Sequence, residues 1–191
     1  MSILKRINEV SVSYNGSAFV LSDSISLETG EKLYVLSVPS TVTSYPTEVT
    51  VLSVSENIVT LTSEAVFTGI AADDIVTFGK SFALKDPKSF QWDLADLESQ
   101  SGRNQMGKSF KDRIDMKRSI SCSWGALENE EISLLLNMIN DIFFYLEYPD
   151  ALSGERELRV FGVSNKTVPM LKQNNDGNIL WTSLSATFTE R

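Results

Sequence analysis

Short runs of alternating apolar and polar residues dominate the first 80 positions of the chain. Val49 and Val51 alternate with Thr50 and Leu52, and many residues of these runs are β-branched. Period-two alternation with β-branched residues is typical of half-buried strands. Turn signals such as Asn15-Gly16 separate the runs. The pattern predicts five short strands, at residues 18–21, 32–36, 48–54, 58–61 and 75–78.

The clearest pair among these strands is a hairpin that joins residues 51–54 to 58–61 through Ser55-Glu56-Asn57. Several short strands separated by turns at close intervals indicate an all-β unit. Strands that close on themselves leave no exposed sheet edge. We therefore expect a small β-barrel over residues 13–81.

Beyond residue 82 the pattern mixes strands with one helix. Residues 110–124 alternate, with Ile120 and Cys122 on one face, and strands are expected again at 143–148, 157–163 and 179–189, with a turn at 149–154. Between the strands expected at 110–124 and 143–148, apolar residues repeat every three or four positions from Ile132 to Phe143. Such spacing predicts an amphipathic helix over about residues 128–142, lying on a sheet.

The two patterns predict a mainly β (α+β) protein in two parts. Residues 4–12 are too few to stand alone and must pair with another part of the chain. This favours a domain made of residues 1–12 and 82–191, with residues 13–81 inserted as the barrel. The alternative is two domains in series, with a boundary near residues 79–82.

A polar stretch stands between the strand signal at residues 90–97 and the next strand. Its residues Glu98-Ser99-Gln100-Ser101-Gly102 make a continuous strand improbable, so we expect a long exposed loop that runs to Gly107. Long loops in compact domains are usually functional or disordered. Arg103 in such a loop offers a planar fork for a carboxylate on a neighbouring subunit. The candidate subunit-interface residues are Ser101, Gly102, Arg103, Asn104, Gly107, Lys108, Lys111 and Arg113.

Charge changes this picture in one respect. The formal net charge of the 191-residue chain is −8, which argues against specific nucleic-acid binding. Nearly every charged residue between positions 14 and 79 is acidic, whereas bases predominate from Arg103 to Arg118. Such asymmetry suits a protein with complementary surfaces, and a solvated loop is the other explanation.

Candidate chemistry is sparse. The chain has no His and one Cys, Cys122, so neither a catalytic triad nor an internal disulfide is expected. Acidic pairs such as Asp112 with Asp115 lack a distinctive context, and Gly107-Lys108-Ser109 lacks the upstream glycine of a phosphate loop. Asp150, Ser153 and Glu155 fit a turn better than a calcium site. We therefore expect no enzyme activity, no catalytic residue, no cofactor and no metal.

Location follows from similar absences. No apolar run approaches the roughly 18 to 20 residues of a membrane helix, and the first residues lack the apolar segment of a signal peptide. We therefore expect that the protein is made in the cytoplasm and does not insert into a membrane.

The order of several motifs in the second part resembles a known family. They are Asp86-Pro87-Lys88, Ser101-Gly102-Arg103-Asn104, Gly107, Asp112-Arg113-Ile114, Trp124, Glu130-Glu131 and the turn from Tyr148 to Gly154. This order resembles small, functionally uncharacterised proteins encoded among the tail genes of bacteriophages and prophages of Gram-positive bacteria. The resemblance covers about residues 85–191, together with residues 1–12, and the barrel is an addition to the family pattern.

The resemblance implies a virion component made in a host bacterium. The expected fold is a tail-tube- or baseplate-like β-sandwich or barrel with one packed helix. The expected role is a tail tube, tube-to-baseplate adaptor or hub subunit, which would bind copies of itself in a ring and other tail or baseplate proteins. The alternatives are a carbohydrate- or host-surface-binding module and an assembly factor absent from the mature particle.

Overall fold

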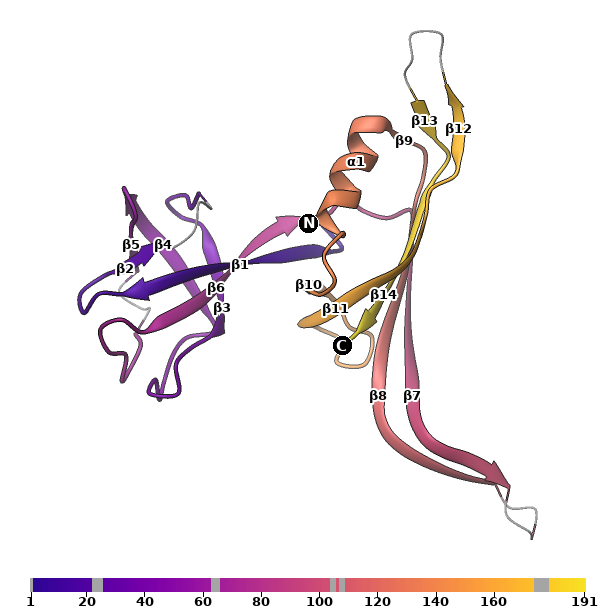
Figure 1. Cartoon of the computed structure of the whole chain (residues 1–191), viewed down its shortest axis with the longest axis horizontal. Helices are drawn as coiled ribbons and strands as arrows, with labels where there is room; N and C mark the ends of the chain where they lie inside the picture. Colours follow the sequence, from indigo (N-terminus) through magenta and orange to yellow (C-terminus); the bar gives the residue numbers. More distant parts are fainter. Residues whose placement is uncertain (1, 22–25, 63–65, 104–105, 107–108, 174–178) are drawn as a thin grey trace. The chain divides into compact units, whose positions relative to one another are not determined.

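A computed structural model describes residues 2–21, 26–62, 66–103, 106, 109–173 and 179–191, with only the backbone described at 98–102 and 109–113. The fold is mainly β with one helix and a closed six-stranded barrel (Figure 1). The elements in chain order are β1 (Lys5–Tyr14), β2 (Phe19–Leu21), β3 (Lys32–Ser37), β4 (Glu48–Ser55), β5 (Ile58–Leu61), β6 (Ile75–Ala83), β7 (Ser89–Arg103), β8 (Ser109–Trp124), β9 (Leu127–Glu128), α1 (Asn129–Met138), β10 (Phe144–Pro149), β11 (Arg156–Thr167), β12 (Met170–Gln173), β13 (Ile179–Trp181) and β14 (Leu184–Glu190).

The chain divides into two compact units. The barrel unit is Ile7–Phe82, and the sheet unit combines Met1–Arg6 with Ala83–Arg191. The two boundaries fall inside β1 and β6, so each of these strands contributes residues to both units.

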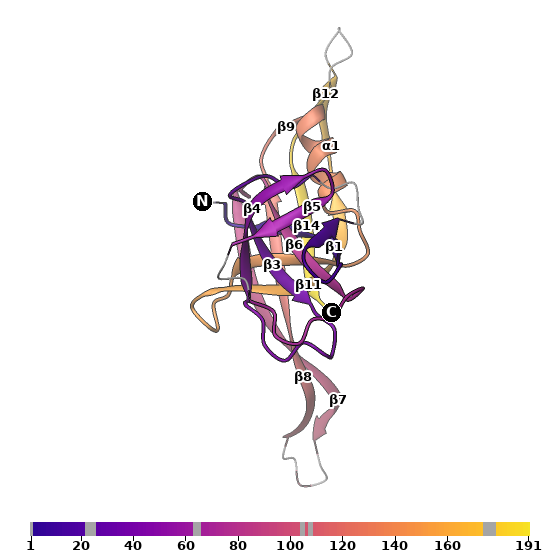
Figure 2. The same ribbon diagram turned by 90° about the vertical axis from the view of Figure 1, so that its left-hand side faces the viewer.

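The barrel unit is closed by its strand order. The strands follow one another as β2-β5-β4-β3-β6-β1, and β2 also pairs with β1 through Val12 and Leu21. Figure 2 looks onto these strands. The interior is filled by alternating apolar residues, among them Val10, Val12, Leu33, Val49, Val51, Val59, Val76 and Phe78. The expected barrel and its β4–β5 hairpin are confirmed, and β1 is the sixth strand that the pattern did not assign to it.

The sheet unit contains the strand order β10-β11-β14-β8-β7 and a second, three-stranded sheet of order β12-β13-β9. Alternation along β8 and β14 places Ile120, Cys122 and Phe188 in one core with the apolar face of α1. Trp124 is fully buried there, and its indole nitrogen donates to the Lys85 carbonyl at 2.7 Å. A buried indole with a partner closes this core, as expected of a large amphipathic ring.

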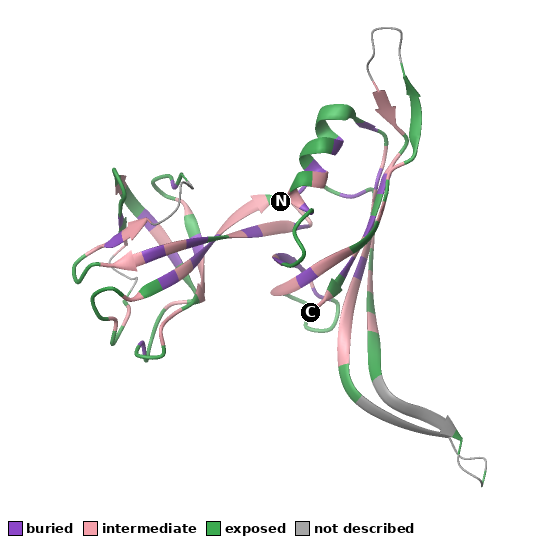
Figure 3. Ribbon diagram, in the orientation of Figure 1, coloured by how far each residue is buried: buried purple, intermediate pink, exposed green. Residues whose placement is uncertain are grey.

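Helix α1 begins with a capping box. The Glu128 side chain accepts from the Glu131 backbone, and the Glu131 side chain accepts from the Glu128 nitrogen at 3.2 Å. This satisfies two donors that the first turn would otherwise leave unpaired. Ile132 and Leu135 turn inward while Leu134 stays exposed, as the buried and exposed colours of Figure 3 show along the helix.

The expectation of a long loop up to Gly107 was wrong for residues 98–103, and residues 104, 105 and 107 lie outside the described residues. Strand β7 continues to Arg103 and β8 begins at Ser109, and the two strands pair from Ser89 and Ser123 to Arg103 and Ser109. The polar residues of this stretch are compatible with a strand because the partner strand satisfies the backbone groups along one edge. Cross-strand pairing outweighs intrinsic preference in such a case.

Several other elements also differ from the sequence prediction. The helix ends at Met138, not near residue 142, and the nitrogen of Ile139 bonds to the Leu136 carbonyl at 3.2 Å in a tight last turn. The strand expected over 179–189 is broken at Thr182 into β13 and β14. Strands β9 and β12 were not predicted, because each is short and is defined by its pairing with β13.

Replacement of Gly79 in β6 is expected to destabilise the barrel unit. A Cβ atom there would collide with Ile7 and would lie 3.1 Å from the Cδ1 atom of Leu36. Overpacking of this kind costs about 1–3 kcal/mol, so Gly79→Ala should lower the free energy of unfolding by that amount in denaturant titrations. The control is Gly125→Ala, whose Cβ would meet the Lys88 Cδ atom at an ordinary 3.9 Å. Equal stability of the two variants would contradict the close packing.

Candidate subunit-interaction site

The most distinctive feature of the sheet unit is a two-stranded ribbon. Strand β14 pairs with β8 only from Trp124 to Ser119, whereas β7 pairs with β8 for nine further pairs, from Leu94 opposite Arg118 to Arg103 opposite Ser109. We call residues 94–103 and 109–118 the ribbon. Figure 1 shows β7 and β8 continuing past the end of β14. Within the described residues, no third strand pairs with the ribbon.

Most of the predicted interface residues lie on the ribbon. Ser101 and Gly102 lie on β7, opposite Lys111 and Phe110 of β8. Arg113 lies opposite Glu98, and Arg103 is exposed where β7 ends. The structure thus brings Ser101, Gly102, Arg103, Lys111 and Arg113 onto one hairpin. Asn104, Gly107 and Lys108 lie outside the described residues.

Large apolar side chains are exposed on the ribbon. Ile114 is 65% exposed and Leu97 is 44% exposed, next to a register shift between the two strands. Met106, which lies between β7 and β8 in the sequence, is also exposed. Exposed apolar side chains beside an open sheet edge are typical of surfaces that bind another chain. The sequence contained this signal, since Ile114 and Leu97 stand among polar residues.

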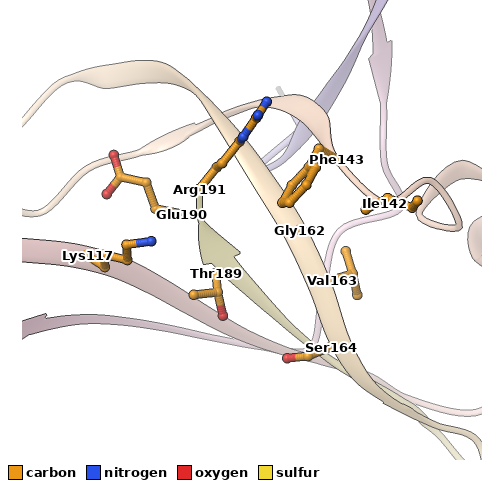
Figure 4. Close-up of a pocket in the computed structure, with 9 residues that line it drawn as sticks. All are labelled: Lys117, Ile142, Phe143, Gly162, Val163, Ser164, Thr189, Glu190 and Arg191. Carbon is orange, nitrogen blue, oxygen red and sulfur yellow. The ribbon is translucent and has the colours of Figure 1, made fainter. Parts of the chain in front are cut away.

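A shallow pocket of about 380 Å³ lies at the root of the ribbon. Its lining comes from β8, β11, β14 and the segment between α1 and β10 (Figure 4): Lys117, Ile142, Phe143, Gly162, Val163, Ser164, Thr189, Glu190 and Arg191. We call its Lys117, Ile142, Phe143 and Arg191 the cationic shelf. Ile142 is 83% exposed, and the Arg191 guanidinium lies 4.9 Å from the centre of the Phe143 ring. Sequence reasoning missed this site because Ile142 was assigned to the end of the helix and Phe143 to the start of the next strand.

The segment that forms the shelf is held in place by several contacts. Arg6 donates to the Met138 carbonyl and pairs with Asp141. Gly162 leaves room for the segment, since a Cβ there would lie 3.1 Å from the Ile142 carbonyl oxygen and 3.2 Å from the Phe143 ring. The apolar side chains of the shelf are therefore presented by an anchored backbone, which reduces the ordering cost of binding.

A network of charged side chains lies where the apolar core of the sheet unit ends. Asp150 is 2% exposed and accepts hydrogen bonds from the Arg118 Nε atom at 2.5 Å and the Tyr148 hydroxyl at 2.9 Å. Arg118 also reaches Glu190 at 3.4 Å, and Arg159 joins Glu190 at 3.0 Å. These contacts connect β8, β11 and β14 to the turn after β10. The role fits a structural cross-link, because every charge in it has a partner.

The electrostatics of Asp150 follow from these bonds. Burial raises the pKa of its carboxyl, but hydrogen bonds from the Leu152 nitrogen, Tyr148, Arg118 and the Ser153 nitrogen outweigh burial, and the pKa lies below its ordinary value of 3.8. Burial, reinforced by the Asp150 carboxylate, raises the pKa of Tyr148. The expected turn at residues 149–154 is confirmed, with Asp150 as its main acceptor.

The described residues contain no group of three or more His, Cys, Asp or Glu side chains that could hold a metal ion. Cys122 is buried, and burial raises the pKa of its thiol to about 12. Across the described part of the chain, no helix is long and apolar enough to cross a membrane.

A second, smaller hollow of about 250 Å³ lies in the barrel unit between Tyr14, residues 17–19 and residues 59–62. A carbohydrate-binding surface on the barrel would need exposed aromatic side chains, and its tyrosines are Tyr14, Tyr34 and Tyr45. Tyr45 is 48% exposed, while Tyr14 and Tyr34 are half-buried.

No protein-family model, no curated protein and no solved structure matches this chain.

Removal of the Asp150 charge is expected to weaken the sheet unit and flatten its acid sensitivity. Breaking a buried charge network by losing one partner costs about 3–5 kcal/mol, so Asp150→Asn should lose that much stability at pH 7. In the wild type, a folded-state pKa below 3.8 means that this contribution is complete above the ordinary carboxyl range and is lost as pH falls through 3.8 and below.

Chemical denaturation at several pH values checks this. Asp141→Asn is the control, because Asp141 pairs with Arg6 yet its side chain is 58% exposed, and it should cost less than about 1 kcal/mol. An Asp150→Asn variant with the acid sensitivity of the wild type would contradict the assignment.

Cys122 should not react with thiol reagents in the native protein at pH 8, because a thiol of pKa about 12 is almost entirely protonated there. Denaturation should make it react at once with Ellman's reagent. Rapid labelling of the folded protein would show that the strand containing Cys122 is not buried.

Proposed function

We propose that the protein is a non-enzymatic structural subunit of a bacteriophage tail, which assembles with copies of itself into a ring in the tube, the tube-to-baseplate adaptor or the hub. The ribbon is the observation that carries this proposal. A two-stranded hairpin is marginally stable by itself in water, and its unpaired edge is a template for another chain. A ring subunit supplies that other chain in every copy.

Two further observations support the proposal. Residues 85–191 and 1–12 resemble tail-gene-encoded proteins in the order of their motifs, and the ribbon carries Ser101, Gly102 and Arg103 of that resemblance. Arg103 is exposed at the end of β7, where its guanidinium can reach a carboxylate of a neighbouring subunit. Other tail or baseplate proteins would bind the ends of such a ring.

Disruption of the ribbon should abolish assembly without unfolding the subunit. Deletion of residues 100–106, or the double substitution Leu97→Asp and Ile114→Asp, removes the hairpin end or its exposed apolar surface. Both variants should remain monomeric by multi-angle light scattering and keep a melting temperature within a few degrees of wild type. Leu152→Asp is the matched control, since Leu152 is 59% exposed in a turn outside the ribbon, and it should assemble normally. Normal assembly of the deletion variant would contradict the proposed role of the ribbon.

Cryo-electron microscopy of purified particles tests the location. We expect a symmetric ring of this protein in the tail, with the ribbon buried between subunits. Absence from the mature particle would indicate an assembly factor instead. Density for the barrel unit alone against a host-cell glycan would favour the surface-binding alternative.

A further inference from the structure

The cationic shelf has the features of a protein-binding surface. Ile142 protrudes and Phe143 is half exposed, beside a shallow and open pocket (Figure 4). Small-molecule sites bury most of their ligand inside a cavity, whereas exposed apolar side chains on a rim suit a second protein surface. The Lys117 and Arg191 side chains form no ion pair within the described part of the chain. A partner should therefore bring aliphatic side chains together with a carboxylate.

The barrel unit has the complementary charge. Residues 7–82 contain nine acidic residues against Lys32 and Lys80, a net charge of −7, whereas the remainder of the chain is close to neutral at −1. Several of these carboxylates are already engaged: Glu31 pairs with Lys80 at 3.1 Å, and Asp74 accepts from the Ala71 nitrogen at 2.8 Å. Glu56 and Glu48 have no such partner among the described residues.

The β4–β5 hairpin combines that free charge with apolar surface. Glu56 lies at the tip of the hairpin, because Ser55 and Ile58 form its last pair and leave Glu56 and Asn57 as the turn. Leu52 and Ile58, on the two strands, are 55% and 44% exposed. The hairpin therefore offers two aliphatic side chains and one unpaired carboxylate, which is the combination that the cationic shelf requires.

We infer that the β4–β5 hairpin of a second copy of this chain docks on the cationic shelf, with Leu52 and Ile58 against Ile142 and Phe143, and Glu56 between Lys117 and Arg191. This inference rests on the proposed ring assembly and specifies one of its contacts. Apolar contact at the centre supplies affinity, and the charges fix the orientation. The contact also gives the barrel a role, since each barrel then bridges two subunits.

Site-directed cross-linking tests the contact directly. Two variants that each carry one added cysteine, Ile58→Cys and Ile142→Cys, are mixed under mild oxidation. They should form a disulfide-linked heterodimer, while Ile58→Cys mixed with Leu171→Cys, a position on β12 that is 54% exposed, should not. Cys122 is buried and does not compete. Equal yields in the two mixtures, or no heterodimer in either, would overturn the inference.

A charge swap supplies the second test. Glu56→Lys should weaken self-association roughly tenfold or more, because it places like charges together. Lys117→Glu with Arg191→Glu should do the same, and all three substitutions in one chain should restore association in sedimentation velocity. If the ribbon deletion abolishes assembly but the charge variants assemble as the wild type does, only this inference fails. If the wild type stays monomeric at every concentration, both the inference and the ring assembly fail.

Discussion

Pairing of β8 on both of its edges is the constraint on which the sheet unit depends. From Trp124 to Ser119 it bonds to β14 on one side and β7 on the other, and this part of the strand supplies Ile120 and Cys122 to the core. Past Ser119 the β14 edge is lost, and only β7 remains. The same strand therefore begins as half of an exposed ribbon and ends at the centre of a core.

The point where β14 leaves β8 is also where the apolar core gives way to charge. Arg118 directly precedes Ser119 on β8, and it meets Asp150, Glu190 and, at 4.0 Å, Glu157. Buried charges are costly unless they are paired, and here the bonds to Asp150 come from two side chains and two backbone nitrogens. The network ties the base of the ribbon to β11 and to the turn after β10, so the ribbon leaves the sheet from a rigid root.

The chain carries two surfaces of opposite charge. Around the ribbon root, Lys117, Arg191, Ile142 and Phe143 present positive charge and apolar surface, and the barrel unit carries a net charge of −7 with exposed aliphatic side chains on one hairpin. A chain that carries both surfaces is suited to bind copies of itself, because the positive surface of one copy can contact the negative surface of the next. Heterologous contacts of this type close into rings when the rotation between copies permits.

Sequence alone determined the local elements, because hydrophobic period is a local property. The alternation in β4, β5 and β8 and the three-to-four-residue repeat from Ile132 to Ile139 each identified their element, and the strand-rich pattern indicated the barrel. Tertiary structure decided what depends on residues distant in the chain. The polar segment 98–103 is a strand because residues 109–113 pair with it, Phe143 lies between α1 and β10 against Gly162, and Asp150 is buried because Arg118, from β8, neutralises it. Such partners cannot be read from spacing, since their proximity is created only when the chain folds.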